Sequence, residues 1–192
     1  MNALSRAKAM LADPTAEWTA VEKESGDPAF LLSRYVAPLA LIPALCSAIG
    51  ASAIGVIIPD GTLARTPPFD GVFGAIFGYA ESVAVVLVLG LIINFIAPLF
   101  DTRRNFDSAF KLAVYSYTPV WLTGIFLLLP GLRFLTLLGC YGSYVAWTGL
   151  PRLMKSPPEH TQSYAFVITV CAAALTLGAA AVQRALFGTP GL

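Results

Sequence analysis

Five long apolar runs alternate with short polar segments along most of this chain. We place the runs at about residues 35–58, 72–99, 110–129, 132–150 and 164–184. A hydrocarbon core of about 30 Å needs roughly 20 apolar residues in an α-helix. Each run is long enough to cross a bilayer, and the third and fourth are the tightest. The pattern predicts an all-α fold, an integral membrane bundle of five transmembrane helices.

The first 30 residues differ from this pattern, so we divide the chain into an N-terminal segment, 1–30, and a transmembrane domain, 31–192. Asp13 and Pro14 are typical of a helix N-cap and first helical position. Trp18 and Val21 share the apolar side of the helix that follows. We expect two short helices at the membrane surface, with Trp18 at headgroup depth. A partly ordered cytoplasmic tail is the alternative.

Basic residues predict the orientation of the spans, because cytoplasmic loops are enriched in lysine and arginine. With a cytoplasmic N-terminus, nine of the 12 basic residues lie on the cytoplasmic side, and Arg65, Arg133 and Arg184 lie on the other. We therefore expect the N-terminus to be cytoplasmic. Residues 110–150 could instead form a re-entrant hairpin. The charge count does not separate the two topologies, because both leave the flanking loops on one side.

Composition agrees with a membrane protein. Hydrophobic residues make up 57% of the chain and charged residues only 12%, whereas soluble domains carry about a quarter charged residues. A net charge of +1 gives no sign of a nucleic-acid partner; the predicted surroundings are membrane lipids. No motif indicates a catalytic site, a metal site or a cofactor. We expect a non-enzymatic protein without a cofactor.

The densest charge falls in the loop after the second run. Arg103, Asp107 and Lys111 are spaced four residues apart, which on a helix would give a ladder of opposite charges. The ladder could simply anchor the third span and set its depth. It could also join a cytoplasmic surface that binds a protein partner or anionic headgroups. The candidate residues of that surface are Trp18, Arg103, Arg104, Asp107, Lys111, Arg152 and Lys155.

Glu81 lies inside the second run, where a carboxylate is costly and usually faces the protein interior. We expect it to point into the bundle and to bond a hydroxyl such as that of Tyr115, Tyr117 or Tyr144. It could handle protons or cations, anchor a lipid headgroup, or make a buried structural hydrogen bond. Asn94 is thirteen residues further on and should face a largely different side of the helix, where an interhelical hydrogen bond is expected.

Two prolines interrupt apolar runs and should kink the helices that carry them, Pro43 in the first span and Pro119 in the third. The kinks could open a polar pocket or give a tapered bundle with no cavity. Small residues recur every four positions in the first and fourth spans and indicate helix-packing seams. These seams could serve internal packing or a homo-oligomer.

The order of these features resembles the bacterial branch of the Yip1 domain family. The resemblance rests on Tyr35-Val-Ala-Pro-Leu39 at the first span, Tyr115-Ser-Tyr-Thr-Pro119 in the third, and Leu150-Pro-Arg-Leu-Met154 before the last. It implies five spans with a cytoplasmic N-terminus, in the bacterial cytoplasmic (inner) membrane. Eukaryotic members associate with Rab GTPases and with one another.

Two functional hypotheses follow. The first is a membrane-organising scaffold that binds protein partners or lipids on its cytoplasmic face. The second is a small transporter or channel in which Glu81 is the proton- or cation-handling group.

Overall fold

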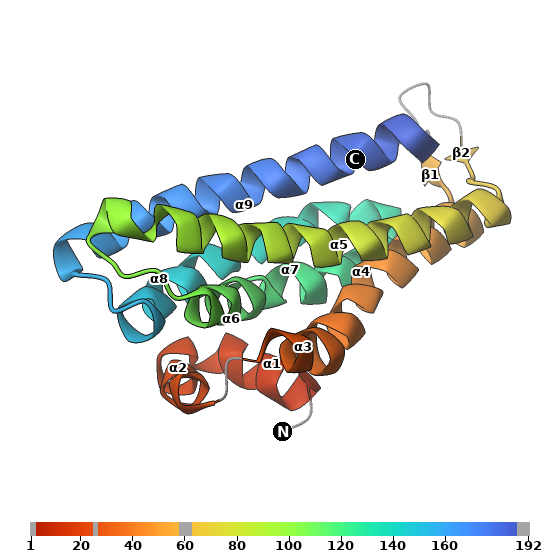
Figure 1. Cartoon of the computed structure of the whole chain (residues 1–192). Helices are drawn as coiled ribbons and strands as arrows, with labels where there is room; N and C mark the ends of the chain where they lie inside the picture. Colours follow the sequence, from red (N-terminus) through yellow and green to blue (C-terminus); the bar gives the residue numbers. More distant parts are fainter. Residues whose placement is uncertain (1–2, 25–26, 58–62, 188–192) are drawn as a thin grey trace.

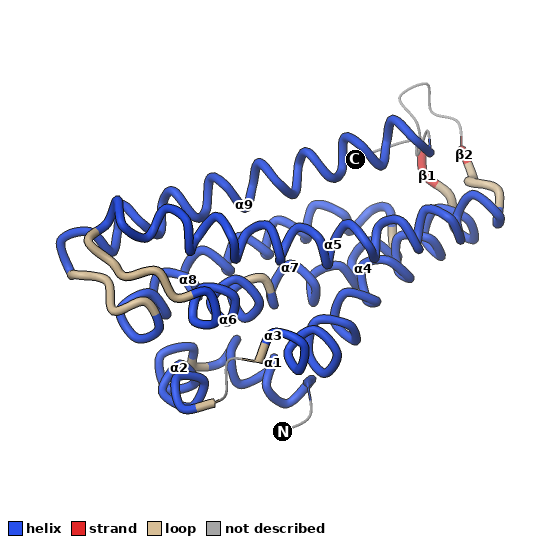
Figure 2. Tube along the Cα trace, viewed as in Figure 1, coloured by secondary structure: helices blue, strands red, loops and turns tan. Residues whose placement is uncertain are grey.

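The computed structural model describes residues 3–24, 27–57 and 63–187. Helices dominate these residues (Figure 2). The only strands in the described ranges form a small antiparallel pair, β1 (Val56–Ile57) and β2 (Leu63–Ala64). The predicted all-α class is confirmed.

Two short helices begin the chain, α1 (Ala3–Ala12) and α2 (Pro14–Lys23). Asp13 caps α2, because its carboxylate accepts a hydrogen bond from the backbone N–H of Ala16 at 3.0 Å. Pro14 occupies the first helical position, where a missing N–H has no cost. The predicted start of this helix is therefore confirmed. We call α1 and α2 together the N-terminal module.

Three helical stretches are long and apolar enough to cross a membrane within the described residues: Pro28–Ile54, Pro68–Phe100 and Pro158–Phe187. The first begins earlier than predicted, because Asp27 caps it by accepting a hydrogen bond from the N–H of Ala29. It continues through Pro43 without a break. Two short π-helical segments, η1 and η2, flank its central helix α4. The elements are α3 (Pro28–Leu31), η1 (Leu32–Val36), α4 (Ala37–Ile49), η2 (Gly50–Ile54), α5 (Pro68–Ile96), η3 (Ala97–Phe100) and α9 (Pro158–Phe187).

The third and fourth apolar runs are not continuous helices. The third consists of α6 (Phe106–Ser116), α7 (Thr118–Thr123) and the 3-10 segment η4 (Gly124–Leu128). The fourth consists of the 3-10 segment η5 (Pro130–Cys140) and α8 (Tyr141–Leu153). The break between α6 and α7 falls at Tyr117, two residues before Pro119, which cannot donate the backbone hydrogen bond that a continuous helix needs.

The helices form layers (Figure 1). α5 and α9 run beside each other along one side, α6, α7 and α8 lie in the middle, and α1 and α2 lie on the opposite side. The loops 101–105 and 154–157 meet at one end of the bundle. α6 is the centre of the core, since every residue from Ala109 to Ser116 is buried. α8 packs closely against the C-terminal end of α6 at Gly142, where a Cβ would lie 2.4 Å from the Ser116 carbonyl oxygen.

Candidate functional site beneath the N-terminal module

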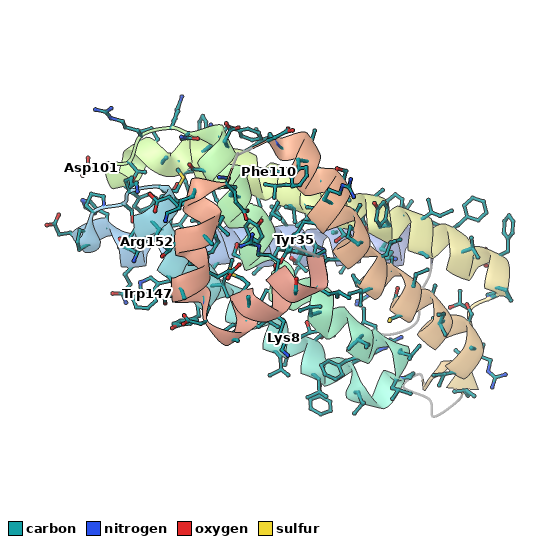
Figure 3. All side chains as sticks on the ribbon, turned by 90° about the horizontal axis from the view of Figure 1, so that it is seen from below. Lys8, Tyr35, Asp101, Phe110, Trp147 and Arg152 are labelled. Carbon is teal, nitrogen blue, oxygen red and sulfur yellow. The ribbon has the colours of Figure 1, made fainter. Side chains whose placement is uncertain are left out.

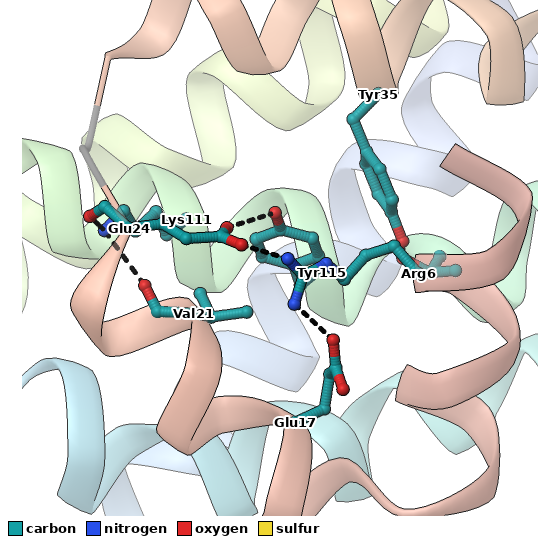
Figure 4. A network of polar contacts seen from close by, with 8 residues as sticks. Arg6, Glu17, Val21, Glu24, Tyr35, Lys111 and Tyr115 are labelled. Carbon is teal, nitrogen blue, oxygen red and sulfur yellow. Dashed lines mark hydrogen bonds and ion pairs between the residues drawn. The ribbon is translucent and has the colours of Figure 1, made fainter. Parts of the chain in front are cut away.

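An arginine of α1 joins the first turn of α2 to the end of that helix (Figure 4). The Arg6 guanidinium pairs with Glu17 through Nη1 and with Glu24 through Nη2. The Arg6 side chain is only 9% exposed. Burial lowers its pKa, but the attraction of Glu24 and the hydrogen bond to Glu17 outweigh this effect and raise the pKa of Arg6. The two carboxylates therefore hold a buried positive charge.

Lys111 of α6 completes the attachment from the bundle side. Its ammonium donates to the carbonyl oxygen of Val21 at 3.1 Å and to that of Glu24. The last carbonyls of a helix lack partners within the helix and carry partial negative charge. Lys111 thus caps the C-terminus of α2. With only 6% of its surface exposed, it is not part of a binding surface, contrary to the sequence-based expectation.

Aromatic side chains extend this cluster into the membrane bundle. The Tyr115 hydroxyl donates to Glu24 Oε2 at 3.4 Å. Its ring lies 4.8 Å from that of Tyr35, centroid to centroid, and the Tyr35 hydroxyl bonds the Thr118 hydroxyl at 2.8 Å. We call Arg6, Glu17, Glu24, Lys111 and Tyr115 the buried clamp. It connects α1 and α2 to α6 through charge-assisted hydrogen bonds.

Trp18 supplies the apolar part of the attachment. It is fully buried, and its indole N–H lies 3.1 Å from both the Val145 carbonyl oxygen and the Thr148 hydroxyl oxygen of α8. Its ring fits because position 149 is glycine: a Cβ there would lie 2.6 Å from Trp18 Cε2. The prediction that Trp18 forms part of a binding surface is therefore wrong, because the ring inserts between the N-terminal module and α8. Its position at headgroup depth stays a prediction.

The predicted charge ladder is not formed. Arg103 precedes α6, whose N-cap is Asn105, so it does not share a helical stripe with Asp107 and Lys111. Lys111 turns towards α2 instead of pairing with Asp107. The helix starts later than the spacing suggested, and the tertiary contact with α2 competes for the lysine.

The remaining charged candidates stay on the surface at the end of the bundle where the loops 101–105 and 154–157 meet. Arg103, Arg104, Asp107, Arg152 and Lys155 are exposed. Lys155 pairs with Glu22 of α2, and its hydrogen bond lowers the pKa of the Glu22 carboxyl. Figure 3 shows Asp101, Arg152 and Trp147 at this end of the molecule. We call Arg103, Arg104, Asp107, Arg152 and Lys155 the charged surface.

The intramembrane polar candidates do not converge on one place. Tyr115 bonds Glu24, and the Tyr117 hydroxyl bonds the Thr176 hydroxyl of α9 at 3.0 Å. Neither hydroxyl is paired with Glu81, which is half-buried and makes no side-chain hydrogen bond within the described part of the chain. The predicted bond between Glu81 and these tyrosines is therefore wrong.

Asn94 lies elsewhere on α5, in a hollow of about 360 Å³ that Glu81 does not line. Its Oδ1 atom is buried without a hydrogen-bond partner among the described residues. The expected separation of Asn94 from Glu81 is observed, but the expected interhelical hydrogen bond is not seen for this oxygen.

Sequence reasoning missed three members of the buried clamp, namely Arg6, Glu17 and Glu24. Their spacing carries no pattern, because the contacts that matter lie far apart in the chain. Lys111 is 87 positions from Glu24, and Trp18 is 130 positions from Thr148. The one available signal was a lysine at the start of an apolar run, where a buried ammonium needs acceptors.

Comparison with known proteins agrees with this architecture. The chain is similar to "Inner membrane protein YohC" of Escherichia coli strain K12 and to the protein of the same name from E. coli O6:H1, each 26% identical over 165 residues. The alignment covers 84% of this chain and 85% of each relative. No solved structure matches. The relatives' name and the three long apolar helices identify an integral inner-membrane protein. The family model for the Yip1 domain matches residues 8–182, and this chain belongs to the Yip1 domain family.

Proposed function

We propose that this chain is a non-enzymatic scaffold of the inner membrane that binds protein partners on its cytoplasmic face. The binding face is the charged surface together with the N-terminal module. In this proposal the N-terminus is cytoplasmic and the chain crosses the membrane five times. A second copy of the chain is one candidate partner.

The observation that carries the proposal is the buried clamp. Arg6 ties the two helices of the module together through Glu17 and Glu24, Lys111 and Tyr115 fix the module to α6, and Trp18 fixes it to α8. The charged groups of this attachment bond one another, a tyrosine hydroxyl or backbone carbonyls, and so hold the helices together. The attachment leaves the charged surface exposed, and it holds the neighbouring N-terminal module in a fixed position on the bundle. A rigid polar face of this kind suits recognition of a partner, because less ordering is needed on binding.

Segment lengths support five spans. α6, α7 and η4 run in one direction and η5 and α8 return beside them (Figure 1). An α-helix rises 1.5 Å per residue and a 3-10 helix about 2.0 Å, so the first path is roughly 36 Å long and the second roughly 42 Å. That exceeds the hydrocarbon thickness of about 30 Å. The bias of basic residues supports a cytoplasmic N-terminus.

The transporter hypothesis has less support. A transport site needs several polar groups around the carboxylate, whereas Tyr115 and Tyr117 bond Glu24 and Thr176. We therefore favour the scaffold.

The test is in-cell photo-crosslinking from position 152, with a photoreactive amino acid in place of the exposed arginine. We expect discrete protein adducts that decrease when Arg103 and Arg104 are both changed to glutamate. The matched control is Arg65→Glu, a reversal at an exposed arginine in the loop at the opposite end of the bundle. Thiol labelling at position 108 must show that the reversed variant keeps its orientation.

No adducts from position 152 would contradict the proposal. So would adducts that are the same in the correctly inserted double variant as in the native chain.

A further inference from the structure

We propose that the outer face of α5 is a binding site for an anionic phospholipid, with Arg104 at its phosphate and an acyl chain along the helix. The lipid is bound by particular residues, which distinguishes this site from the non-specific contact that any apolar helix makes with the bilayer. The proposal rests on the proposed cytoplasmic position of the 101–105 loop, but it does not need the scaffold role.

Two hollows lie end to end along α5. One, of about 630 Å³, lies between α5 and the start of the first long helix and is lined by Ala29, Leu32, Ser33, Tyr79, Ala80, Val83, Ala84 and Leu87. The other, of about 360 Å³, is lined by Val88, Leu91, Ile92, Asn94, Phe95 and Arg104.

The two hollows share one stripe of the helix. Ala80, Ala84, Leu87, Leu91 and Phe95 recur at intervals of three or four residues, which places them on one face. Leu91 is 54% and Phe95 70% exposed. Because Pro68–Phe100 is a membrane-spanning stretch, this face meets lipid tails. The small alanines make the stripe concave beside α3 and η1, which gives an acyl chain a channel.

A positive charge closes one end of this channel. The Arg104 guanidinium carbon lies 5.3 Å from the centre of the Phe95 ring, a cation–π contact that folds the side chain back over α5. Phe95 is only five residues before the end of η3, at the loop end of the span. The guanidinium therefore lies close to the boundary between tails and headgroups, where long basic side chains reach lipid phosphates.

The carboxylates nearest in the sequence, those of Asp101 and Asp107, do not neutralise the Arg104 charge. Asp101 lies 3.1 Å from His160 Nε2 of α9. Asp107 lies on α6, where its charge acts on Lys111. Arg104 has no ion pair within residues 3–24, 27–57 and 63–187. An arginine beside hydrocarbon needs a counter-charge, and a lipid phosphate is the anion present at that depth.

Asn94 adds a second polar group beside the guanidinium. Its side chain lines the same hollow as Arg104, and its buried Oδ1 has no partner within the described residues. A glycerol headgroup offers hydroxyl donors for that oxygen, whereas choline offers none. The combination of an unpaired guanidinium, an unpaired amide oxygen and an apolar channel fits phosphatidylglycerol better than a transmembrane helix of another protein.

The experiment uses the full chain reconstituted in vesicles with a trace of phospholipid that carries a photoreactive group in one acyl chain. The headgroup is phosphatidylglycerol in one set and phosphatidylcholine in the other, and adducts are mapped by peptide mass spectrometry. The outward residues of α9, such as Phe166, Val170 and Leu177, serve as an internal reference for ordinary bilayer contact. We expect adducts at residues 79–95 to favour phosphatidylglycerol about fivefold over the α9 reference, as one basic side chain near an anionic lipid gives.

Arg104→Gln should reduce this preference to about one, while the matched variant Arg103→Gln should retain it, because Arg103 does not line the hollow. Equal preference at α5 and α9 would overturn the proposal. An equal loss of the phosphatidylglycerol preference in the two variants would also overturn it. The preference would then depend on the total surface charge and not on the position of Arg104. Adducts absent from α5 while α9 is labelled would overturn it too, since lipid would then have no access to this face. Failure of any kind here leaves the protein adducts from position 152 unaffected, so the two proposals fail separately.

Discussion

Replacing Trp18 by alanine tests how the N-terminal module is held. The side chain is completely buried, and truncating a buried tryptophan to alanine costs about 3–5 kcal/mol. The ion pairs of Arg6 lie within the module and its end, so they survive the change. We expect the loss to appear as local opening of α2 away from α8. A cost of 3 kcal/mol corresponds to loss of protection on the order of 100-fold or more.

Trp18→Phe separates the ring from its N–H group. It keeps most of the apolar contact and loses the donor, while Val145 O still accepts from the Thr148 hydroxyl at 2.9 Å. We expect a cost of about 1–2 kcal/mol, or roughly 5- to 30-fold in protection.

Amide hydrogen exchange of the purified chain measures both effects at residues 14–23. Trp147→Ala is the matched control, because Trp147 is 47% exposed and has no hydrogen bond to the N-terminal module. Exchange in α9 should stay native in every variant, which shows that the bundle is intact. Native protection of α2 in Trp18→Ala, with an intact α9, would refute the reasoning.

Four further outcomes are expected. Gly149→Val should loosen α2 in the same exchange assay, because its Cβ would meet the buried indole at 2.6 Å; unchanged exchange would count against the tight fit. The pKa of Glu22 is lowered by the hydrogen bond from Lys155, so this contact stabilises the fold above the ordinary glutamate pKa of 4.5 and is lost as the pH falls through the lower folded value. Exchange at the end of α2 should rise over that acid range, and Glu22→Gln should remove the dependence. In a variant without native cysteines, Gly131→Cys should react only with thiol reagents added outside, because a fourth span needs this turn on that side; a Cβ there meets nothing within 4 Å, and failure to react would favour a re-entrant hairpin. Vesicles with the native chain or with Glu81→Gln should show the same ion flux as empty vesicles, and flux that Glu81→Gln reduces would revive the transporter hypothesis.

Local sequence patterns predicted the elements whose formation depends on neighbours in the chain. Asp13 and Pro14 marked the start of α2, and that helix begins there. The second and fifth apolar runs correspond to α5 with η3 and to α9, each slightly longer than predicted. Hydrophobic runs of this length have few alternatives in a bilayer, since every backbone polar group must be bonded internally.

Patterns failed where a contact joins distant parts of the chain. Lys111 reads as the end of an interfacial charge ladder, and Trp18 reads as an interfacial anchor. Each is buried because its partner comes from another segment, α2 for the lysine and α8 for the tryptophan. The 3-10 stretches of the third and fourth runs were equally hidden, because apolar periodicity is weak where the packing of neighbours decides the helix type.

The capping of α2 by Lys111 has a consequence for how the protein is made. The N-terminal module can dock only after residues 106–153 have been synthesised, because α6 and α8 provide its binding partners. Until then the carbonyl groups of Val21 and Glu24 lack the ammonium that caps them. If the N-terminal module and Lys111 lay on opposite sides of the bilayer, this contact could not form, so insertion of both segments with the same orientation is a condition for completing the fold.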